Sequence, residues 1–454
     1  MDPVMDLVMD IDPGFAESVM KKALRSGADH AEIYIRSSRG LTVEVKDRQV
    51  DSLKSSRSFG YGLRVLRKGC PGFSYSNLQD DADTVVRNAV DAAAYADPDI
   101  HLDFPYPAAS ASVNVQDPAV ETTAEEDAIR MTIQMEDAAR KADERVSKIR
   151  KASGSFASAE LLIMNSKKVH VGYRSTACSA QITVVAEDEG DAQAGFDYSG
   201  SRFLRDVSFE ETGTNAAQHA CSLLGARRFS ARRAPVILES SVAADFLGIL
   251  SGSLSADHVQ KGKSLLSGRQ GTSIISPGIS IVDNGLLPGN LGSCPVDDEG
   301  VPVMKKVLFD RGVLQGFLHN THTARKWAMP STGNATRGGY ASLPSVGITN
   351  LFLEGATGEV MIPRQALSTS VGTGLYVLDA MGVHTANPVS GDYSVGVTGL
   401  WIENGVPAYP VKEAVISGNI LELFNSIVAV GDDLRFYGGI GCPSLVIREM
   451  NISA

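Results

Sequence analysis

The chain has 454 residues and a formal net charge of −11, with 43% hydrophobic and 21% charged residues. This composition is ordinary for a soluble globular protein with a large core. The acidic balance disfavours nucleic acid as a partner, because phosphate binding needs clustered Lys and Arg. No apolar run reaches the ~18 residues of a membrane span. The acidic N-terminus lacks the basic region of a secretory signal, so we do not expect it to be one. We expect no membrane partner.

The cysteine pattern indicates a reducing compartment. The five cysteines are odd in number and have no C-x-x-C spacing. They stand at Cys70, Cys178, Cys221, Cys294 and Cys442. Scattered cysteines of this kind favour free thiols over a disulfide framework or a zinc ribbon. We therefore expect a cytoplasmic protein.

The first hundred residues predict strands between two helices. Apolar residues recur at helical spacing from Phe15 to Leu24, with Gly27 as a plausible stop, and again from Asp80 to Ala96. Between these helices we expect strands at 31–35, 41–45 and 59–66, with turns at 46–48 and 68–69.

A short glycine-aromatic stretch occurs twice. Gly72-Phe-Ser-Tyr-Ser76 has a near copy in Gly195-Phe-Asp-Tyr-Ser199, 123 residues further on. Each copy follows a predicted strand pair and precedes a predicted helix, the second one at 212–224. We interpret this as an internal duplication of an antiparallel ββ-α unit, with a chance coincidence as the alternative.

The rest of the first half connects these copies. An Ala/Ser/Pro-rich connector covers about 105–123, and a long helical stretch is expected from Ala124 to Ile149. The basic run from Arg227 to Arg233 marks a boundary and is interpreted as a solvated linker rather than a nucleic-acid patch. We predict an α+β fold: a duplicated antiparallel ββ-α N-terminal domain at 12–230, then a β-rich, glycine-rich C-terminal domain at 231–454.

The stretch from Gly372 to Gly431 is the most informative part of the second half. Leu375, Val377, Leu400 and Ile402 alternate with other residues at strand spacing. Asn404-Gly405 predicts a tight hairpin, and Pro407 and Pro410 place the returning strand at an edge or a bulge. The many glycines indicate close approach of backbone to backbone. A helical stripe is expected from Leu421 to Val428.

Several motifs in this half resemble one known family. The motifs are Gly391-Asp-Tyr-Ser-Val-Gly396, Trp401-Ile-Glu-Asn-Gly405, Tyr409-Pro-Val411, Ile416-Ser-Gly-Asn419, Phe309-Asp-Arg-Gly-Val-Leu314, Ala324-Arg-Lys326, Ser331-Thr-Gly-Asn-Ala335 and Pro443-Ser-Leu-Val-Ile447. In this order they resemble the TldD/PmbA family, also called the modulators of DNA gyrase. The resemblance is nearest to the PmbA (TldE) branch and runs from about residue 14 to the end.

The resemblance implies a zinc site that this sequence does not match. Catalytic members of the TldD branch carry His-Glu-x-x-x-His on a helix, and a distant cysteine completes the zinc ligands. The matching positions here hold Leu247, Gly248 and Gly252. Val430-Gly-Asp-Asp433 stands where the cysteine is expected, and Cys442 lies well past it. We therefore predict no catalytic and no metal-binding residue in this chain, and we expect the zinc cofactor in a TldD-type partner.

Other kinds of site have weaker support. His319-Asn-Thr-His322 has metal-compatible spacing, but no third ligand stands nearby in the sequence. Gly262-Lys-Ser264 resembles the end of a phosphate loop but lacks its first glycine. His384, Asp392 and Ser394 are close enough in sequence to form a Ser/His/Asp arrangement, although turn and capping hydrogen bonds explain the same residues.

The favoured hypothesis is a non-catalytic subunit of a TldD/TldE-type zinc metallopeptidase that acts on unfolded or extended peptides. The expected partner is a TldD-like subunit in a heterodimer, with a homodimer as an alternative. An exposed strand edge could hold a peptide through main-chain hydrogen bonds. The predicted peptide-facing residues are His319, His322, Arg325, His384, Asp392 and Tyr393. Two alternatives remain open: a hydrolase that works alone with a non-metal site, and a regulatory binding protein linked to DNA gyrase.

Overall fold

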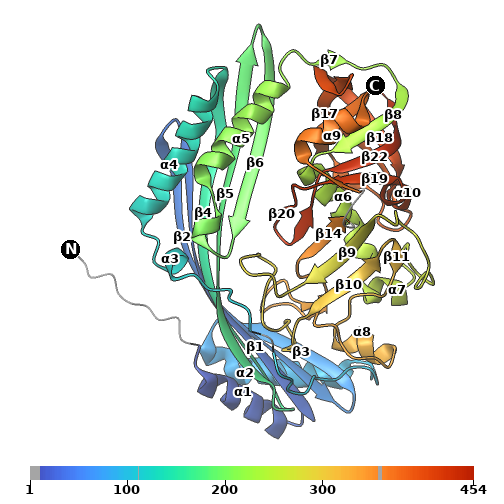
Figure 1. The fold of residues 1–454 in the computed structure, drawn as a ribbon. Coiled ribbons are helices and arrows are strands. Elements are labelled where there is room, and N and C mark those ends of the chain that lie inside the picture. Colours follow the sequence, from blue (N-terminus) through green and yellow to red (C-terminus); the bar gives the residue numbers. More distant parts are fainter. Residues whose placement is uncertain (1–10, 111, 356–359, 454) are drawn as a thin grey trace.

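The computed structural model describes residues 11–110, 112–355 and 360–453. Figure 1 shows two strand-rich parts that face each other; they pack together at the lower end of the view, and the chain crosses from one to the other near the top, between α5 and β7. We call residues 11–226 the N-terminal part and residues 227–453 the C-terminal part. Their mixture of helices and long strands confirms the α+β prediction. Within the described residues no helix is both long and apolar enough to cross a bilayer.

The N-terminal part is built on one six-stranded sheet in the order β3-β2-β1-β4-β5-β6, with antiparallel neighbours throughout. Its strands are β1 (His30–Lys46), β2 (Gln49–Arg67), β3 (Cys70–Ser76), β4 (Val146–Asn165), β5 (His170–Asp188) and β6 (Asp191–Ser201). Its helices are α1 (Pro13–Arg25), α2 (Ala82–Tyr95), α3 (Pro118–Glu121), α4 (Glu125–Ala142) and α5 (Phe209–Ser222). In Figure 1, α1 and α2 lie at the lower end of this sheet and α4 and α5 at the upper end.

Two predictions about this sheet were wrong in detail. The strands expected at 31–35 and 41–45 are one strand, β1, which is 17 residues long. The residues between the two apolar segments are polar or glycine and only partly buried, so the middle of β1 lacks the alternation of a half-buried strand. The long helix expected to run to Ile149 ends at Ala142, because Val146 already begins β4.

The predicted turns are confirmed. Asp47 and Arg48 have φ of 51° and 61°, and Lys68 and Gly69 have φ of 52° and 77°. Two consecutive residues with positive φ make the two-residue turn whose twist suits antiparallel strands. These turns set the registers of β1 with β2 and of β2 with β3.

The two glycine-aromatic copies occupy matching places on opposite edges of the sheet. Gly72 lies on β3 and Gly195 on β6. A Cβ at Gly72 would lie 1.9 Å from the carbonyl oxygen of Ala89 on α2, and a Cβ at Gly195 would lie 2.2 Å from that of Ala216 on α5. Each glycine therefore lets a helix backbone touch a strand. Each half has three strands between helices rather than the two expected, and an internal duplication stays a prediction.

The C-terminal part contains an eight-stranded sheet, a six-stranded sheet and a two-stranded ribbon. The first has the order β15-β19-β22-β8-β16-β17-β18-β7, the second β11-β10-β9-β14-β21-β20 and the ribbon β12-β13. The bounds are β7 (Arg227–Arg228), β8 (Arg232–Leu238), β9 (Ile279–Asn284), β10 (Lys305–Asp310), β11 (Val313–Leu314), β12 (Ala335–Thr336), β13 (Ser345–Val346), β14 (Leu351–Gly355), β15 (Met361–Ile362), β16 (Gly374–Met381), β17 (Asp392–Glu403), β18 (Val406–Asn419), β19 (Ile427–Gly431), β20 (Arg435–Tyr437), β21 (Ile440–Cys442) and β22 (Leu445–Ser453).

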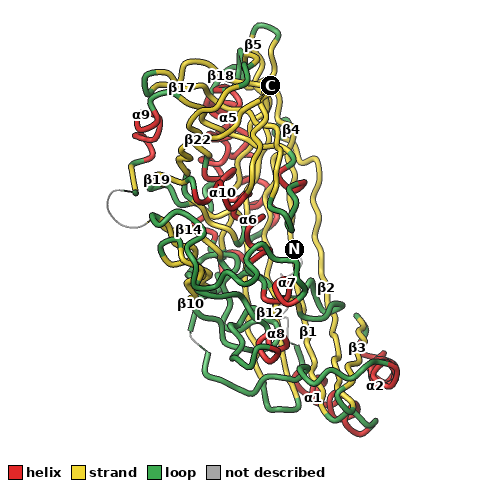
Figure 2. Tube along the Cα trace, turned by 90° about the vertical axis from the view of Figure 1, so that its right-hand side faces the viewer, coloured by secondary structure: helices red, strands yellow, loops and turns green. Residues whose placement is uncertain are grey.

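Helix α6 lies in the main core of this part. The helices are α6 (Ser240–Ser253), α7 (Ala256–Gln260), α8 (Thr321–Lys326), α9 (Leu367–Val371) and α10 (Ile420–Asn425). Phe246 and Leu247 of α6 are fully buried with Val236 and Leu375 of the larger sheet and Ile281 of the smaller one. Figure 2 shows α6 among the strands of this part, with α10 beside it. This burial fixes which face of α6 can reach a cavity.

Other predictions for this half were mixed. The Asn404-Gly405 turn is confirmed, with φ of 52° and 79° between β17 and β18. The register of β17 with β18 shifts between Trp401 and Ile402, where Pro407 interrupts the ladder. The helical stripe expected to reach Val428 ends at Asn425, because β19 begins at Ile427.

The arginines of the basic run are exposed to solvent, as predicted, but the run is not an unstructured linker, because two strands begin in it. Arg227 and Arg228 form β7, which pairs with β18, and Arg232 begins β8. The Arg228 guanidinium lies 2.8 Å from Glu413, and that of Arg232 lies 4.8 Å from the centre of the Trp401 ring. Charge pairing and stacking on an aromatic face explain this run as part of the sheet.

A buried ion network joins the two parts at the lower end. Arg64 of β2 lies 2.9 Å from Glu32 and 3.0 Å from Glu299, and Arg337 lies 2.5 Å from Glu32. Burial alone would lower the pKa of Arg64, but the two carboxylates raise it. The Tyr340 ring also fills the space above Gly60, where a Cβ would lie 2.4 Å from it. These contacts make the lower end a firm junction.

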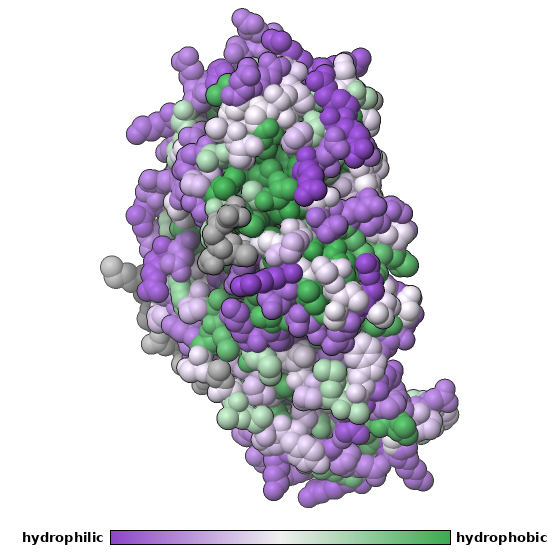
Figure 3. Space-filling model, turned by 45° about the vertical axis from the view of Figure 1, so that its right-hand side comes forward, coloured by the Kyte–Doolittle hydropathy of each residue, from purple (hydrophilic) through white to green (hydrophobic). Residues whose placement is uncertain are grey.

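The outer surface is mostly hydrophilic. Figure 3 shows this for one face, with apolar side chains gathered over the upper and middle regions. Exposed apolar residues include Met361 on β15 and Val428 on β19, two neighbouring strands. The five cysteines are free thiols.

Candidate functional site

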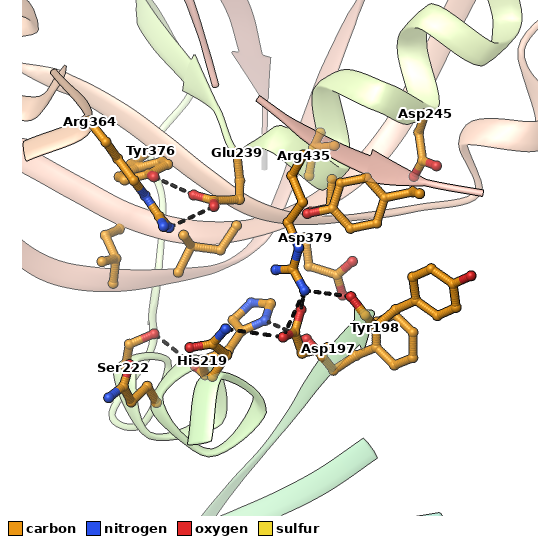
Figure 4. A pocket seen from close by; sticks show the side chains of 18 of the residues that line it. Asp197, Tyr198, His219, Ser222, Glu239, Asp245, Arg364, Tyr376, Asp379 and Arg435 are labelled. Atoms are coloured by element: carbon orange, nitrogen blue, oxygen red, sulfur yellow. Dashed lines mark hydrogen bonds and ion pairs between the residues drawn. The ribbon is translucent and has the colours of Figure 1, made fainter. Parts of the chain in front are cut away.

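A cavity of about 660 Å³ lies between the upper ends of the two parts. Strand β6 and helix α5 line it from the N-terminal part, and α6, β16 and β20 line it from the C-terminal part. We call it the interdomain cavity. Figure 4 shows its side chains, which come from segments far apart in the sequence. Its size is in the range of ligand pockets.

Arg435 of β20 bridges this cavity. Its Nη2 lies 2.8 Å from Asp197 Oδ1 and donates a hydrogen bond of 2.5 Å to the carbonyl oxygen of Tyr198, both on β6. Asp197 is only 7% exposed and also accepts from Asn215 Nδ2 at 3.2 Å. Burial alone would lower the pKa of Arg435, and the hydrogen bond and charge of Asp197 raise it. The Arg435 guanidinium therefore stays charged where it bridges β20 and β6 (Figure 4).

A second paired arginine lies on the C-terminal side. Arg364 Nη2 lies 2.8 Å from Glu239 Oε1, and the Tyr376 hydroxyl donates to the other oxygen of Glu239. Burial and the charge of Glu239 raise the pKa of Tyr376, so this phenol stays protonated. Arg364 Nε also lies 3.5 Å from Asp433. Both arginines of the cavity thus already hold carboxylates of this chain.

Asp245 of α6 and Asp379 of β16 are different. Both line the interdomain cavity and keep part of their surface exposed to solvent. Among the described residues neither carboxylate takes part in a hydrogen bond or an ion pair. Partial burial and then the charge of Asp379 raise the pKa of Asp245. The unpaired charge in the cavity is therefore negative.

A smaller cavity of about 530 Å³ adjoins α6 at the place expected for the zinc motif. Gly248 and Gly252 line it together with Asp245 and His384, whereas Leu247 is fully buried in the core. Positions 248 and 252 are one helical turn apart and so share a face. The zinc motif needs a carboxylate at position 248 and an imidazole at position 252, and glycine has no side chain that could provide either.

The side chains at this helix do not fit the zinc ion that the resemblance implies. A catalytic zinc site takes about three protein ligands, and neither leucine nor glycine has a donor side chain. In the described part of the chain, no group of three or more His, Cys, Asp or Glu side chains could hold a metal. Cys442 is buried on β21, and burial raises its pKa well above the ordinary value.

Three predicted peptide-facing residues lie at or beside α8, close to the junction of the two parts. His319 is 1% exposed, its ring lies 5.1 Å from that of Trp327, and burial lowers its pKa to about 4. His322 Nε2 lies 2.8 Å from Asp99, and Arg325 lies 2.8 Å from Asp103. The structure uses the last two to attach α8 to the N-terminal part.

The other three predicted residues lie elsewhere. His384 stands in the short 3-10 helix Val383–Thr385 and lines the smaller cavity. Asp392 accepts a hydrogen bond of 3.0 Å from Asn419, and the buried Tyr393 packs against Phe246 at 4.9 Å. Of the six, His384 lines one of the two cavities and the others line neither. The structure therefore does not bring the six together in one site.

Sequence reasoning missed the residues that do line the interdomain cavity. The charged ones are Asp197, Glu239, Asp245, Arg364, Asp379 and Arg435. They come from β6, β16, β20, α6 and the segments before α6 and α9. These residues are far apart in the sequence, so no short motif could have indicated that they lie together. The one available signal was the second glycine-aromatic copy, since Phe196 and Tyr198 of that copy line the cavity.

Three family models match along the chain: PmbA/TldA metallopeptidase domain 1 at residues 31–93, the central domain at 119–224 and the C-terminal domain at 231–454. The Metalloprotease PmbA of Escherichia coli O157:H7 is 30% identical over 445 residues, which cover 95% of this chain and 94% of that protein.

Solved structures agree with these matches. A putative modulator of a DNA gyrase from Thermotoga maritima superposes with a TM-score of 0.90 at 26% identity, covering 97% of this chain and 100% of that one. TldE from Thermococcus kodakarensis gives a TM-score of 0.89 with the same coverage, and its 20% identity speaks for the fold alone. The chain therefore belongs to the PmbA/TldD metallopeptidase family, in its PmbA branch.

Proposed function

We propose that this chain is a peptide-binding subunit without a catalytic centre of its own, which works with a TldD-type zinc peptidase. The observation that carries the proposal is the exposed face of α6. At the positions of the zinc motif this face presents Gly248 and Gly252 to a cavity, while Leu247 points into the core. A zinc-bound water needs ligands that hold the ion and a base that takes the proton, and these three residues provide none.

The interdomain cavity supports the peptide part of the proposal. It lies between two sheets, one of which ends there in the edge strand β6. A strand edge can hold an extended chain through main-chain hydrogen bonds, which do not depend on the side chains of the peptide. The Escherichia coli relative is named as a metalloprotease, and a chain that binds peptides but has no metal ligands at α6 fits a supporting role beside one that has them.

The test uses this chain and a TldD-like chain from the same genome, purified separately and mixed. We expect sedimentation velocity to show a complex of both chains. We also expect mass spectrometry to show cleavage of unfolded peptides by the mixture, and none by this chain alone. Replacing the motif glutamate of the partner with glutamine should abolish cleavage by the mixture. Cleavage that persists with that partner variant would place the catalytic centre in this chain and end the proposal.

A second candidate function rests on Asp245 and Asp379. Two neighbouring carboxylates, one with a raised pKa, are the kind of pair that acts as general acid and base in hydrolysis without a metal. This function predicts peptide cleavage by the chain alone that resists chelators and is lost in Asp245→Asn. Absence of any such cleavage across a peptide library would exclude it.

A further inference from the structure

One arginine between the two parts of the molecule has no carboxylate partner. Arg202 directly follows β6, and its Nη1 donates a hydrogen bond of 3.0 Å to the carbonyl oxygen of Thr176. Its Nη2 donates to the carbonyl oxygens of Leu291 and Ser293 at 2.5 and 2.9 Å. Its buried Nε has no hydrogen-bond partner among the described residues. Buried charges in proteins are ordinarily paired with an opposite charge, whereas the partners of Arg202 are neutral.

The groups that act on this guanidinium do not neutralise it. Burial lowers the pKa of Arg202, and the charge of Arg36 also lowers it. Tyr173 and Cys294 could raise the pKa of Arg202 only as anions. Burial raises the pKa of Tyr173 well above its ordinary value and that of Cys294 to about 12, so both groups are neutral at pH 7. None of the groups that change the pKa of Arg202 is a carboxylate.

Arg36 is a second arginine without a partner. It lies on β1 and is exposed, and its guanidinium takes part in no ion pair or hydrogen bond among the described residues. Arg36 is paired with Leu161 of β4, and Leu161 with Tyr173 of β5, so the three side chains form a row on one face of the sheet. Leu161 and Tyr173 share a hydrophobic cluster with Tyr340, which places this row on the face that meets the C-terminal part.

Asp298 of the C-terminal part is close to Arg36 but is held by other groups. Burial raises the pKa of Asp298, and the charges of Arg337 and Arg36 oppose this rise. Its Oδ2 accepts a hydrogen bond of 2.7 Å from the backbone N–H of Arg337, and its Oδ1 accepts one of 3.4 Å from the Tyr34 hydroxyl. Asp298 therefore leaves the guanidinium of Arg36 free to bind another anion.

We propose that a small oxyanion, either a carboxylate or a phosphate, binds between the guanidinium groups of Arg36 and Arg202. A guanidinium has five N–H donors, and Arg202 uses three of them, so both arginines keep donors for an anion. The planar guanidinium suits carboxylate and phosphate groups. Neither arginine lines the interdomain cavity or the smaller cavity, so this site does not depend on the proposed peptide-binding function.

Binding is tested by isothermal titration calorimetry of this chain with potassium phosphate and, separately, with potassium acetate. Potassium chloride keeps the ionic strength constant, so that general screening of charges does not change. We expect one saturable site per chain, and the anion that binds more tightly identifies the class of ligand. We expect Arg36→Gln to weaken this binding at least tenfold, because hydrogen bonds between charged groups are lost. If neither anion binds the parent protein with saturation, the proposal is wrong.

Arg57→Gln is the matched control for Arg36→Gln, since both variants lose one positive charge. Arg57 is exposed on β2 of the same sheet. Arg36 is paired with Gly60 of β2, and side chains alternate along a strand, so Arg57 lies on the opposite face. We expect Arg57→Gln to bind the anion as tightly as the parent protein. Equal weakening in both variants would show attraction to the net charge alone and would overturn the proposal.

The part of Arg202 is tested through thermal stability. An anion that binds only the native state raises Tm, so phosphate or acetate should raise the Tm of the parent protein relative to chloride. Arg202→Met should lose this shift, and Arg202→Lys, which keeps the charge, should retain part of it. Circular dichroism checks that both variants fold, and Arg36→Gln gives a second measurement if Arg202→Met does not fold. An unchanged shift in folded Arg202→Met or in Arg36→Gln would contradict a site between these two arginines.

Discussion

The glycine at position 195 offers a sharp test of how the N-terminal sheet is packed. In Gly195→Ala the new Cβ would lie 2.2 Å from the carbonyl oxygen of Ala216 and 2.5 Å from the backbone nitrogen of Ala220. Real Cβ atoms stay at least 3.0 Å from such atoms, so α5 has to move by about 0.8 Å. The obstacle is helix backbone, which cannot rotate away as a side chain would.

The magnitude follows from two opposing effects. Overpacking of this kind costs about 1–3 kcal/mol, and a backbone obstacle places it at the upper end. Alanine gains about 0.5–1 kcal/mol over glycine within a strand. The free energy of unfolding should therefore fall by about 2 kcal/mol, which lowers Tm by roughly 4–8 °C for a unit of this size. Gly72→Ala should behave alike, because its Cβ would lie 1.9 Å from Ala89.

The assay is thermal unfolding followed by circular dichroism. Gly172→Ala is the matched control: it lies in β5 of the same sheet, and its new Cβ would have no neighbour within 3.4 Å. We expect this control to be as stable as the parent protein or slightly more so. If Gly195→Ala and Gly172→Ala had the same Tm, the contact between α5 and β6 would be less tight than in the structure.

Further predictions concern charged and titratable groups. Glu299→Gln weakens one of the two ion pairs of the buried Arg64 and should lower the free energy of unfolding by roughly 3 kcal/mol. We also expect limited proteolysis to cleave this variant earlier than the parent. Equal resistance of both proteins to the protease would argue against a firm junction. Arg435→Met should cost about 1–3 kcal/mol, because the buried Asp197 loses its main partner, whereas Arg228→Met removes an exposed pair and should cost at most about 1 kcal/mol in the same melts. Burial lowers the pKa of His319 from 6.5 to about 4. The unfolded chain then binds a proton that the native state refuses, so stability should fall as the pH drops from 6.5 towards 4. Urea unfolding over this pH range should show a smaller loss of unfolding free energy in His319→Phe than in the parent. An equal loss in both proteins would contradict the lowered pKa of His319.

Much of the fold could be predicted because local signals set it. The turns at 46–48 and 68–69 were predicted from their places between apolar strands, and the turn at Asn404-Gly405 from residues that tolerate positive φ. The length of β1 was missed because its middle is partly exposed and lacks the alternation of a half-buried strand. The basic run was misjudged because charge alone does not reveal ion pairs and aromatic faces such as Trp401.

The candidate site was harder to predict. His322 and Arg325 look like binding residues in the sequence, yet their partners Asp99 and Asp103 lie more than two hundred residues away. The same separation conceals the cavity, since Asp197 and Arg435 meet only through the arrangement of the two parts. The resemblance alone placed Gly248 and Gly252 at the positions of the zinc motif, and the structure adds that both line the smaller cavity.

The central claim is that α6 carries no zinc ligands and that peptide cleavage needs a partner. The most direct measurement is the zinc content per chain after incubation with excess zinc and desalting, read together with peptide cleavage by the same sample. We predict less than stoichiometric zinc and no cleavage by this chain alone, and cleavage once the TldD-type chain is added. One firmly held zinc per chain together with cleavage by this chain alone would contradict the account.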